Sequence, residues 1–268
     1  MKRPIIFTDL DGTLLNYSEY SFAEALPALQ LVKDKDVPLI LCSSKTRKEI
    51  ELYRVKLGID HPFISENGGG IFIPEDYFKL GIDNFKFQIE KELVLIRLGA
   101  EYSKLRKALQ ELRAEGFDVR GFGDMTTKDI ADATGQCMDE AELAKERDFD
   151  EPFIYSGSTH KLPLLINAIT AKGFHYTKGK LSHITGDNDK GKAVAILTDL
   201  YKKKYGEIIT IGIGDSPNDI PMLMKVARPV IVQQPDGKYD VPADIPGLIK
   251  AAGIGPVGWN RIILKLIG

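Results

Sequence analysis

Two carboxylates separated by a single residue, Asp9 and Asp11, follow the short apolar segment Ile5–Phe7. Successive side chains of an extended chain alternate between its two sides, so these carboxylates are expected to project to the same side. Gly12 allows the chain to turn sharply directly after them. Two negative charges this close together raise the pKa of one of them unless a cation lies between them. The pair therefore suits a magnesium site, or a nucleophile beside a general acid. The alternative is a polar turn after a strand.

Phosphoryl transfer is one reaction that such a pair can carry out. Asp9 would attack phosphorus to give an aspartyl-phosphate, which divides one difficult displacement into two easier ones. Asp11 would protonate the leaving alkoxide and later remove a proton from the attacking water.

Two further segments could hold phosphate. Ser43 and Ser44 follow the apolar segment Val37–Cys42, and a hydroxyl with successive backbone N–H groups at a strand-to-helix turn is suited to an anion. Taken alone, this segment is more typical of a helix N-cap. Lys190 begins a helical segment, where its ammonium group would neutralise both the nucleophile and a phosphate oxygen. A lone lysine is usually a solvated surface group, so only its position in the chain supports that role.

The fourth segment is acidic, Gly214–Asp219, and it follows the apolar segment Ile208–Ile213. Magnesium prefers hard oxygen ligands and usually keeps several waters, so a couple of carboxylates suffice. Asp215 would bind the metal directly and Asp219 would support it, with Ser216 and Asn218 orienting waters, backbone or phosphate. The alternative is a helix N-cap, and both interpretations can hold together.

The elements that must position these residues alternate between strand and helix, which is typical of a doubly wound α/β sheet. The pattern predicts strands at Val37–Cys42 and Ile208–Ile213, a helix at Arg47–Leu57, and a last core strand at Pro229–Val232. The pattern changes between residues 83 and 187, where a helical segment and the strand-like segment Leu93–Leu98 suggest a small, mostly antiparallel α+β insert. We therefore expect a core from residues 1–82 and 188–268, with a cap domain at 83–187.

In order along the chain, the carboxylate pair, the serine, the lysine and the acidic segment resemble the four motifs of the haloacid dehalogenase (HAD) superfamily. The resemblance spans the whole chain. It implies a Rossmann-like core with an inserted C2-type cap, as in the sugar-phosphatase branch. It also implies magnesium as cofactor, held by Asp9, Asp215 and the backbone carbonyl of Asp11.

Three segments resemble the mannosyl-3-phosphoglycerate phosphatase family: Ser43–Arg47 (SSKTR), Pro62–Gly68 (PFISENG) and Glu146–Phe153 (ERDFDEPF). The resemblance implies hydrolysis of 2-O-mannosyl-3-phosphoglycerate to mannosylglycerate, a compatible solute. This polyanionic substrate needs cationic and hydrogen-bonding groups. The candidates are Glu66, Asn67, Arg147, Glu151, Lys178, Lys180 and His183. Related caps often carry Gly-Arg-Phe where this chain has Gly179-Lys180-Leu181, and lysine lacks the bidentate fork of arginine.

Other functions remain open. The nearest is a related phosphatase acting on glucosyl-3-phosphoglycerate or on sucrose-, trehalose- or hexose-phosphates. A phosphomutase would transfer the phosphate to a second sugar. A non-catalytic phosphosugar sensor is a different class, although a sensor does not need the nucleophile that Asp9 provides.

Composition indicates an ordinary globular protein of 268 residues with 43% hydrophobic residues and a net charge of −2. There is no excess of positive charge to bind nucleic acid. No apolar segment approaches the roughly 18 residues of a membrane span, and the apolar segment at the N-terminus is too short for a signal peptide. Cys42 and Cys137 lie far apart and do not form a metal-ligand pattern. We therefore expect a cytoplasmic enzyme with a small phosphorylated sugar–glycerate as its partner, and neither nucleic acid nor membrane.

Overall fold

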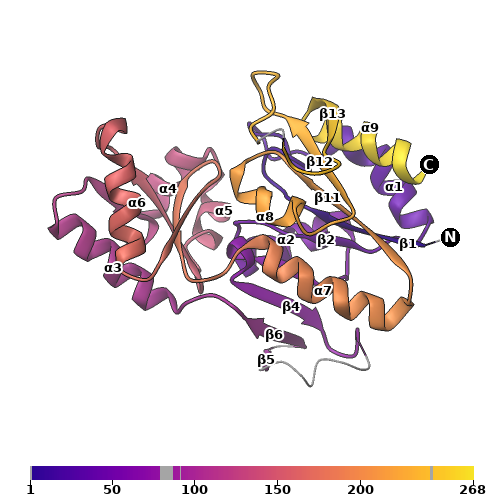
Figure 1. Ribbon diagram of the computed structural model, residues 1–268, viewed down its shortest axis with the longest axis horizontal. Helices are drawn as coiled ribbons and strands as arrows, with labels where there is room; N and C mark the ends of the chain where they lie inside the picture. Colours follow the sequence, from indigo (N-terminus) through magenta and orange to yellow (C-terminus); the bar gives the residue numbers. More distant parts are fainter. Residues whose placement is uncertain (1, 79–86, 91, 242–243) are drawn as a thin grey trace.

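The computed structural model describes residues 2–78, 87–90, 92–241 and 244–268. Within these residues, five parallel strands form the core sheet in the order β13-β12-β11-β1-β2 (Figure 1). Their bounds are Arg3–Thr8 (β1), Leu39–Leu41 (β2), Ile208–Gly214 (β11), Arg228–Gln233 (β12) and Ile249–Ile254 (β13). A parallel sheet with helices on its faces confirms the predicted α/β class.

Helices cover both faces of this sheet. Successive residues of β1 therefore pack in two different apolar clusters, one on each face. Ile6 packs in a cluster with Trp259, whereas Phe7 packs in a cluster with Val194. The first cluster includes residues of α1 (Leu26–Asp34), α2 (Arg47–Leu57) and α9 (Pro256–Ile267), and the second includes residues of α7 (Lys190–Tyr205) and α8 (Ile220–Leu223). Burial on both faces explains the continuous apolar segments Ile5–Phe7 in β1 and Leu39–Leu41 in β2.

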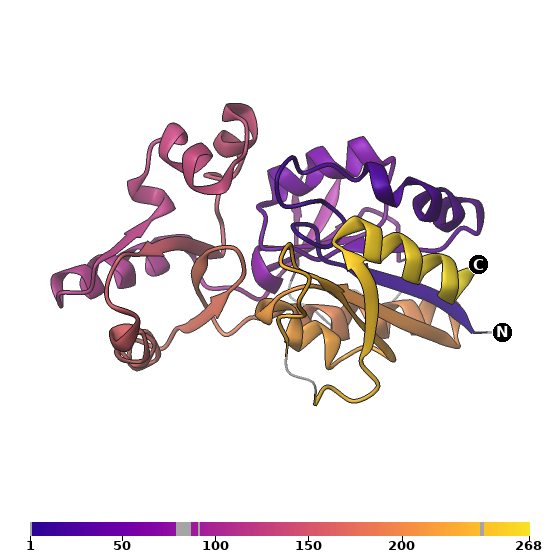
Figure 2. The same cartoon turned by 90° about the horizontal axis from the view of Figure 1, so that it is seen from above.

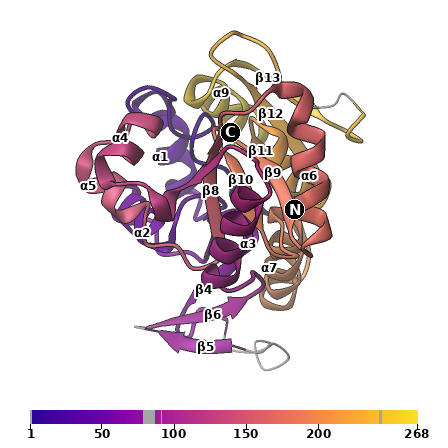
Figure 3. The same ribbon diagram turned by 90° about the vertical axis from the view of Figure 1, so that its left-hand side faces the viewer.

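A second sheet extends the core beyond β2. It consists of antiparallel strands in the order β3-β4-β6-β5, and a bridge between Cys42 and Ile64 connects it to the end of β2. The bounds are Phe63–Ser65 (β3), Gly70–Pro74 (β4), Phe87–Glu90 (β5) and Leu93–Arg97 (β6). Figure 3 shows β4, β6 and β5 at the lower end of the molecule, and Figure 1 shows them beneath α7 and apart from α3 (Tyr102–Ala114) and α6 (Leu162–Ala171).

Our expectation that the strand at Leu93–Leu98 belongs to the sheet of the cap is therefore wrong. It pairs with β4, and its side chains Leu95 and Ile96 join the two apolar clusters of the core. An apolar strand pattern indicates burial but does not identify the partner strand. The expected first domain boundary, between residues 82 and 83, lies outside the described residues.

The cap contains its own antiparallel sheet, in the order β7-β8-β10-β9. The bounds are Val119–Gly121 (β7), Asp150–Tyr155 (β8), His175–Lys178 (β9) and Ser182–Thr185 (β10). Two helices, α3 (Tyr102–Ala114) and α6 (Leu162–Ala171), share an apolar cluster with this sheet. Two shorter helices, α4 (Thr127–Thr134) and α5 (Met138–Leu143), form a separate lobe that faces α2 of the core (Figure 2).

Local signals located several elements well. The helix predicted at Arg47–Leu57 is α2, with Thr46 as its N-cap and Gly58 in the left-handed conformation at its end. Pro229–Val232 lies in β12, but it is not the last core strand, because β13 follows it at the edge of the sheet. Every second residue at that edge is less buried, so the sequence of β13 lacks a continuous apolar segment. Short 3-10 turns occur at Ala23–Ala25, Glu66–Gly68, Phe122–Asp124, Thr159–Lys161 and Pro217–Asp219.

No helix in the described ranges is both long enough and apolar enough to cross a membrane.

Candidate active site

Asp9 and Asp215 lie at the same edge of the core sheet. Asp9 follows β1 and Asp215 follows β11, and these two strands are parallel neighbours. The backbone N–H of Asp9 donates to the carbonyl of Ile213 at 2.9 Å, which continues the pairing past the end of β1. Carboxylate oxygens of Asp9, Asp215 and Asp219 all lie within 4.8 Å of one another. The carboxyl ends of parallel strands, where ligands bind in open α/β sheets, thus form an acidic centre.

Lys190 lies in the middle of this centre. Its Nζ donates to Asp9 Oδ1 and to Asp219 Oδ1, both at 2.6 Å, and its side chain is fully buried. It is the first residue of α7, and the N-cap Asp189 fixes the start of that helix by accepting from the N–H of Lys192. Burial alone would lower the pKa of Lys190, but the charges of Asp219 and Asp9 outweigh burial and raise it. The ammonium group therefore stays charged beside the candidate nucleophile.

Asp219 orients Lys190 and the loop that follows β11. One of its oxygens accepts from Lys190, and Oδ2 accepts from the backbone N–H groups of Asp215 and Ser216 at 3.0 and 3.2 Å. Pro217, at the first position of the following 3-10 turn, suits this capped start. The helix-cap interpretation of the acidic segment is thus correct in part, with Asp219 and Ser216 forming a reciprocal capping box.

Asp215 is held by three side chains. Thr13 Oγ1 donates to Oδ1 at 3.2 Å, while Tyr17 and Gln234 donate to Oδ2 at 2.6 and 2.7 Å. Burial, together with the charge of Asp219, raises the pKa of Asp215 to about 7. Sequence analysis missed Tyr17 and Gln234, because neither belongs to a motif and their positions near Asp215 arise only in the folded chain.

The acidic centre fits a divalent cation. Three buried carboxylates face one ammonium group, which leaves two uncompensated negative charges in a poorly solvated place. Burial also raises the pKa of Asp9 well above its usual value, against the opposing effect of Lys190. The donors are carboxylate oxygens, the ligand type that Mg²⁺ prefers. Among the described residues, Asp9, Asp215 and Asp219 form the group of carboxylates that could hold such an ion.

Asp11 faces the cap and not the acidic centre. Its Oδ2 lies 3.2 Å from Nζ of Lys45, whereas its Oδ1 is buried and has no hydrogen-bond partner among the described residues. Burial raises the pKa of Asp11, and the charge of Lys45 opposes this. A small cavity of about 40 Å³ at the boundary between core and cap contains this carboxylate. Its lining also includes Tyr20, Lys45, Glu49, Gln136, Arg147, Lys180 and His183.

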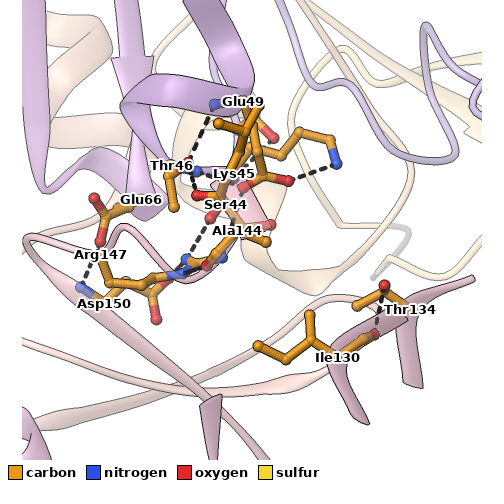
Figure 4. A network of polar contacts seen from close by, with 12 residues as sticks. Ser44, Lys45, Thr46, Glu49, Glu66, Ile130, Thr134, Ala144, Arg147 and Asp150 are labelled. Atoms are coloured by element: carbon orange, nitrogen blue, oxygen red, sulfur yellow. Dashed lines mark hydrogen bonds and ion pairs between the residues drawn. The ribbon is translucent and has the colours of Figure 1, made fainter. Parts of the chain in front are cut away.

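Ser43 and Ser44 lie at the end of β2, beside β1, and so at the same edge as Asp9. Ser43 is fully buried, and its Oγ accepts from the N–H of Lys45 at 3.2 Å. The carbonyl of Ser44 accepts from Arg147 Nη1 at 2.8 Å (Figure 4). The side chain of Ser44 is not the N-cap of α2, because Thr46 has that role.

Four of the seven predicted substrate-binding residues meet in one buried polar network between core and cap. Asn67 Nδ2 donates to Asp150 Oδ2 at 2.7 Å, and His183 Nδ1 lies 3.0 Å from the same carboxylate. Arg147 lies 3.8 Å from that carboxylate. The fourth, Glu66, accepts hydrogen bonds from backbone N–H groups at the start of β8.

This network reaches the acidic segment through Asn218. Its Nδ2 donates to Asn67 Oδ1 at 3.0 Å, and its Oδ1 accepts from Ser216 Oγ at 2.7 Å. Asn218 also lies close to Gly179, which is in the hairpin between β9 and β10. A Cβ added to Gly179 would lie 3.2 Å from Nδ2 of Asn218. The acidic segment and the cap are therefore in contact.

The other three predicted substrate-binding residues are separate from this network. Glu151 is buried within the cap, where it accepts from Tyr102, Arg106 and the N–H of Gly123. Lys178 is exposed on β9. Lys180 lines the same cavity as Asp11, and its Nζ donates to the carbonyl of Thr134 at 2.5 Å and to Tyr20 at 3.0 Å.

Comparisons with known proteins found relatives that match nearly the whole chain. The family model of haloacid dehalogenase-like hydrolases matches residues 6–117. The chain is 47% identical to a glucosyl-3-phosphoglycerate/mannosyl-3-phosphoglycerate phosphatase of Methanococcoides burtonii, over 98% of this chain and 97% of that protein. A protein with the same name from Persephonella marina is 42% identical over 98% and 97% of the two chains. Among solved structures, a haloacid dehalogenase-like hydrolase from B. subtilis has a TM-score of 0.66 at 16% identity, covering 98% of this chain and 99% of that one.

Proposed function

Because the chain belongs to the haloacid dehalogenase-like hydrolases, and within them to the family of the glucosyl-3-phosphoglycerate/mannosyl-3-phosphoglycerate phosphatases, we propose that it hydrolyses 2-O-mannosyl-3-phosphoglycerate. The products are mannosylglycerate and phosphate. The observation that carries this proposal is the position of Lys190, whose ammonium group lies 2.6 Å from both Asp9 and Asp219 at the carboxyl ends of the strands.

In the proposed mechanism, Asp9 attacks the phosphorus atom and the bond from phosphorus to the glycerate oxygen breaks. Asp11 donates a proton to that leaving oxygen, and in the second step it takes a proton from the water that cleaves the aspartyl-phosphate. Lys190, Ser43 and Ser44 hold the phosphate oxygens. Magnesium, bound by Asp9, Asp215 and the Asp11 carbonyl with Asp219 in support, would supply positive charge to offset the charge on the phosphate.

Substrate recognition is proposed for the cavity beside Asp11. Lys180 and Arg147 bring two cationic side chains to its lining beside the Lys45–Asp11 pair, and His183 adds a ring that can donate or accept hydrogen bonds. Positive charge there suits a substrate that carries a carboxylate in addition to its phosphate. We propose that Lys180 meets the glycerate carboxylate, whereas Glu66 and Glu151 organise the structure and do not bind substrate.

The cap must move for the substrate to enter. A volume of about 40 Å³ accommodates little more than water molecules, whereas the substrate contains a sugar ring, a glycerate and a phosphate. We propose that the cap opens to admit substrate and closes to exclude bulk water from the reaction. As to the cap's extent, the pairing of β6 with the core favours a start near Gly99, with a return to the core near residue 187.

The test is phosphate release, with and without magnesium, from a panel of phosphate esters. The panel contains mannosyl- and glucosyl-3-phosphoglycerate, sucrose-6-phosphate, trehalose-6-phosphate and simple hexose phosphates. Preference for mannosyl-3-phosphoglycerate, abolished by EDTA, is expected. Broad, weak hydrolysis of hexose phosphates would keep the chemistry but overturn the substrate. Phosphate transfer to a second sugar would favour a mutase, and binding without turnover would favour a sensor.

A second substrate has support of its own. The names of the two relatives above combine glucosyl- and mannosyl-3-phosphoglycerate, so we propose that the glucosyl ester is hydrolysed as well. The two esters differ in the orientation of one sugar hydroxyl, so comparable kcat/KM values are expected. A location in the cytoplasm, where glycolytic phosphoglycerates occur, stays a prediction from the sequence.

A further inference from the structure

Lys45 has a position that the proposed mechanism does not yet explain. Its side chain is buried, and its Nζ lies 3.2 Å from Asp11 Oδ2 and 3.2 Å from Glu49 Oε1. The ring of Tyr20 lies on one side of the ammonium group, 4.7 Å from ring centre to Nζ. Asp11 therefore has one oxygen held by Lys45 and one, Oδ1, without a hydrogen-bond partner among the described residues. The free oxygen is the one that can meet the leaving group.

Glu49 connects this lysine to the cap. Its Oε1 also accepts from Gln136 Nε2 at 2.7 Å, and Gln136 belongs to the segment between α4 and α5 of the cap. Its Oε2 accepts from the N–H of Thr46 and lies 4.0 Å from Arg147 Nη2. Figure 4 shows Lys45 and Glu49 at the start of α2, with Arg147 approaching from the cap side.

These contacts form one chain from the cap to the reacting groups. Gln136 holds Glu49, Glu49 holds Lys45, and Lys45 holds Asp11. If the cap moved away, Glu49 would lose its contacts with Gln136 and Arg147 and become hydrated. Lys45 would then be exposed to water. An ion pair in water is worth little, whereas a buried and hydrogen-bonded pair fixes the geometry of both partners.

We propose that Lys45 is a positioning residue that orients the Asp11 carboxyl towards the leaving oxygen, and that Glu49 makes this orientation depend on closure of the cap through Gln136. This inference rests on the proposed phosphatase function. The lysine acts through Asp11 and not by contact with the substrate, so the enzyme would carry out proton transfer only when the site is closed.

The consequence can be measured with two esters that differ in their need for an acid. The leaving alkoxide of mannosyl-3-phosphoglycerate needs a proton, whereas 4-nitrophenolate leaves readily without one. Alcohol release is measured in a single turnover with saturating enzyme and magnesium, so that substrate affinity does not enter. Lys45→Met should slow release from mannosyl-3-phosphoglycerate by about 10- to 100-fold. It should slow release of 4-nitrophenol by less than about threefold.

Two further variants separate positioning from other roles. Asp11→Asn/Lys45→Met should be no slower than Asp11→Asn alone, because the lysine has no carboxyl left to orient. Lys45→Met/Glu49→Gln removes both charges, so that Glu49 does not stay buried as a carboxylate without its lysine, and should reproduce the selectivity of Lys45→Met. Lys56→Met is the matched control, since Lys56 also connects α2 to the cap, through Glu140 at 2.9 Å, without contact to Asp11.

The possible outcomes are distinct. Equal slowing of both esters by Lys45→Met, or a double variant much slower than Asp11→Asn, would overturn the inference and point to direct substrate binding. Unchanged rates would also overturn it. If the unaltered enzyme released phosphate from neither ester, the proposed function itself would fail and this inference with it. The same selectivity, weaker, in Gln136→Leu would support the role of the cap.

Discussion

The carboxylate of Glu66, in the core, accepts a hydrogen bond from the backbone N–H of Asp150, in the cap, at 2.9 Å. The N–H groups of Phe149 and Asp148 donate to the same carboxylate at 2.8 and 3.1 Å. Glu66 adopts a left-handed conformation, with a φ of 49°, to reach them. One core side chain thus holds the segment through which the chain enters β8, and the strain in its backbone is offset by three hydrogen bonds.

This contact predicts a pH dependence of stability. Burial raises the pKa of Glu66 to about 8, against the charge of Arg147 and the N–H bonds, while Asp150 and Asp148 add to the increase. The folded protein therefore holds this proton more tightly than the unfolded chain. The contribution to the free energy of unfolding is largest below the ordinary value of 4.5 and decreases as the pH rises to about 8. Denaturant unfolding at several pH values measures it.

The control for that prediction is a matched substitution. Glu66→Gln should flatten the decrease between these pH values, since glutamine does not titrate, whereas Glu19→Gln, at an exposed position, should leave it unchanged. An identical pH profile for the unaltered protein and Glu66→Gln would contradict the assignment.

Magnesium should stabilise the folded protein. The ion would bind the folded acidic centre and not the unfolded chain, so at 100 times its dissociation constant it adds about 2.7 kcal/mol to the free energy of unfolding. Asp215→Asn should abolish most of this increase, while Asp36→Asn, on the surface, should keep it. Thermal unfolding with and without magnesium measures both. A full increase in the Asp215→Asn variant would place the ion elsewhere.

Gly12→Ala should damage the metal site. Gly12 has a φ of 79°, and an added Cβ would lie 2.2 Å from the ring of Tyr17 and 2.6 Å from Asp215 Oδ2. Gly58 has a φ of 64° but open space around an added Cβ, so Gly58→Ala is the control, with a cost of about 1 kcal/mol from backbone strain alone. Magnesium titration should show weaker binding only for Gly12→Ala. Equal affinity in the two variants would mean that the Tyr17–Asp215 contact is unimportant.

Asp9→Asn should eliminate turnover while the protein still binds its ligand. The amide cannot form an acyl phosphate, so the single-turnover rate should fall by at least about 10⁴-fold, as when other enzymic nucleophiles are removed. Asp187→Asn, an exposed position close to α7, serves as control. Calorimetric titration with mannosyl-3-phosphoglycerate checks binding. Residual turnover near the original rate would assign the nucleophile to another residue.

Local sequence signals predicted much of the fold, because several elements carry their own start and end. Thr46 and Gly58 delimit α2 at both ends, and the continuous apolar pattern of Ile208–Ile213 identified β11. The strands that escaped prediction, β5, β9 and β13, are all edge strands. One side of an edge strand faces no partner, so its residues need not be continuously apolar and the periodic signal is weak.

The residues of the candidate site could be predicted where a reactive side chain follows a strand within a few residues. Asp9 and Asp215 carry that signal, and the structure brings them together at neighbouring strand ends. Tyr17, Gln234 and Gln136 carry none, because each gains its partner from a distant segment. Lys45 pairs locally with Glu49, but its contact with Asp11 arises only in the folded chain. We expected the carboxylates of Asp9 and Asp11 to project to the same side of an extended strand. They do not, because β1 ends at Thr8 and the chain turns between the two residues.

By itself, the sequence determined the class of fold, the family and the order of reactive groups, because apolar segments and the polar residues after them are local properties of the chain. Only the tertiary structure decided which groups meet. Lys190 contacts Asp9 across 181 positions of sequence, and Gln136 contacts Glu49 across 87. Such contacts depend on how the sheet and the cap pack. Packing also decides which side chains are buried. Burial, in turn, decides which carboxylates hold protons, which ion pairs are rigid and what kind of cation suits the acidic centre.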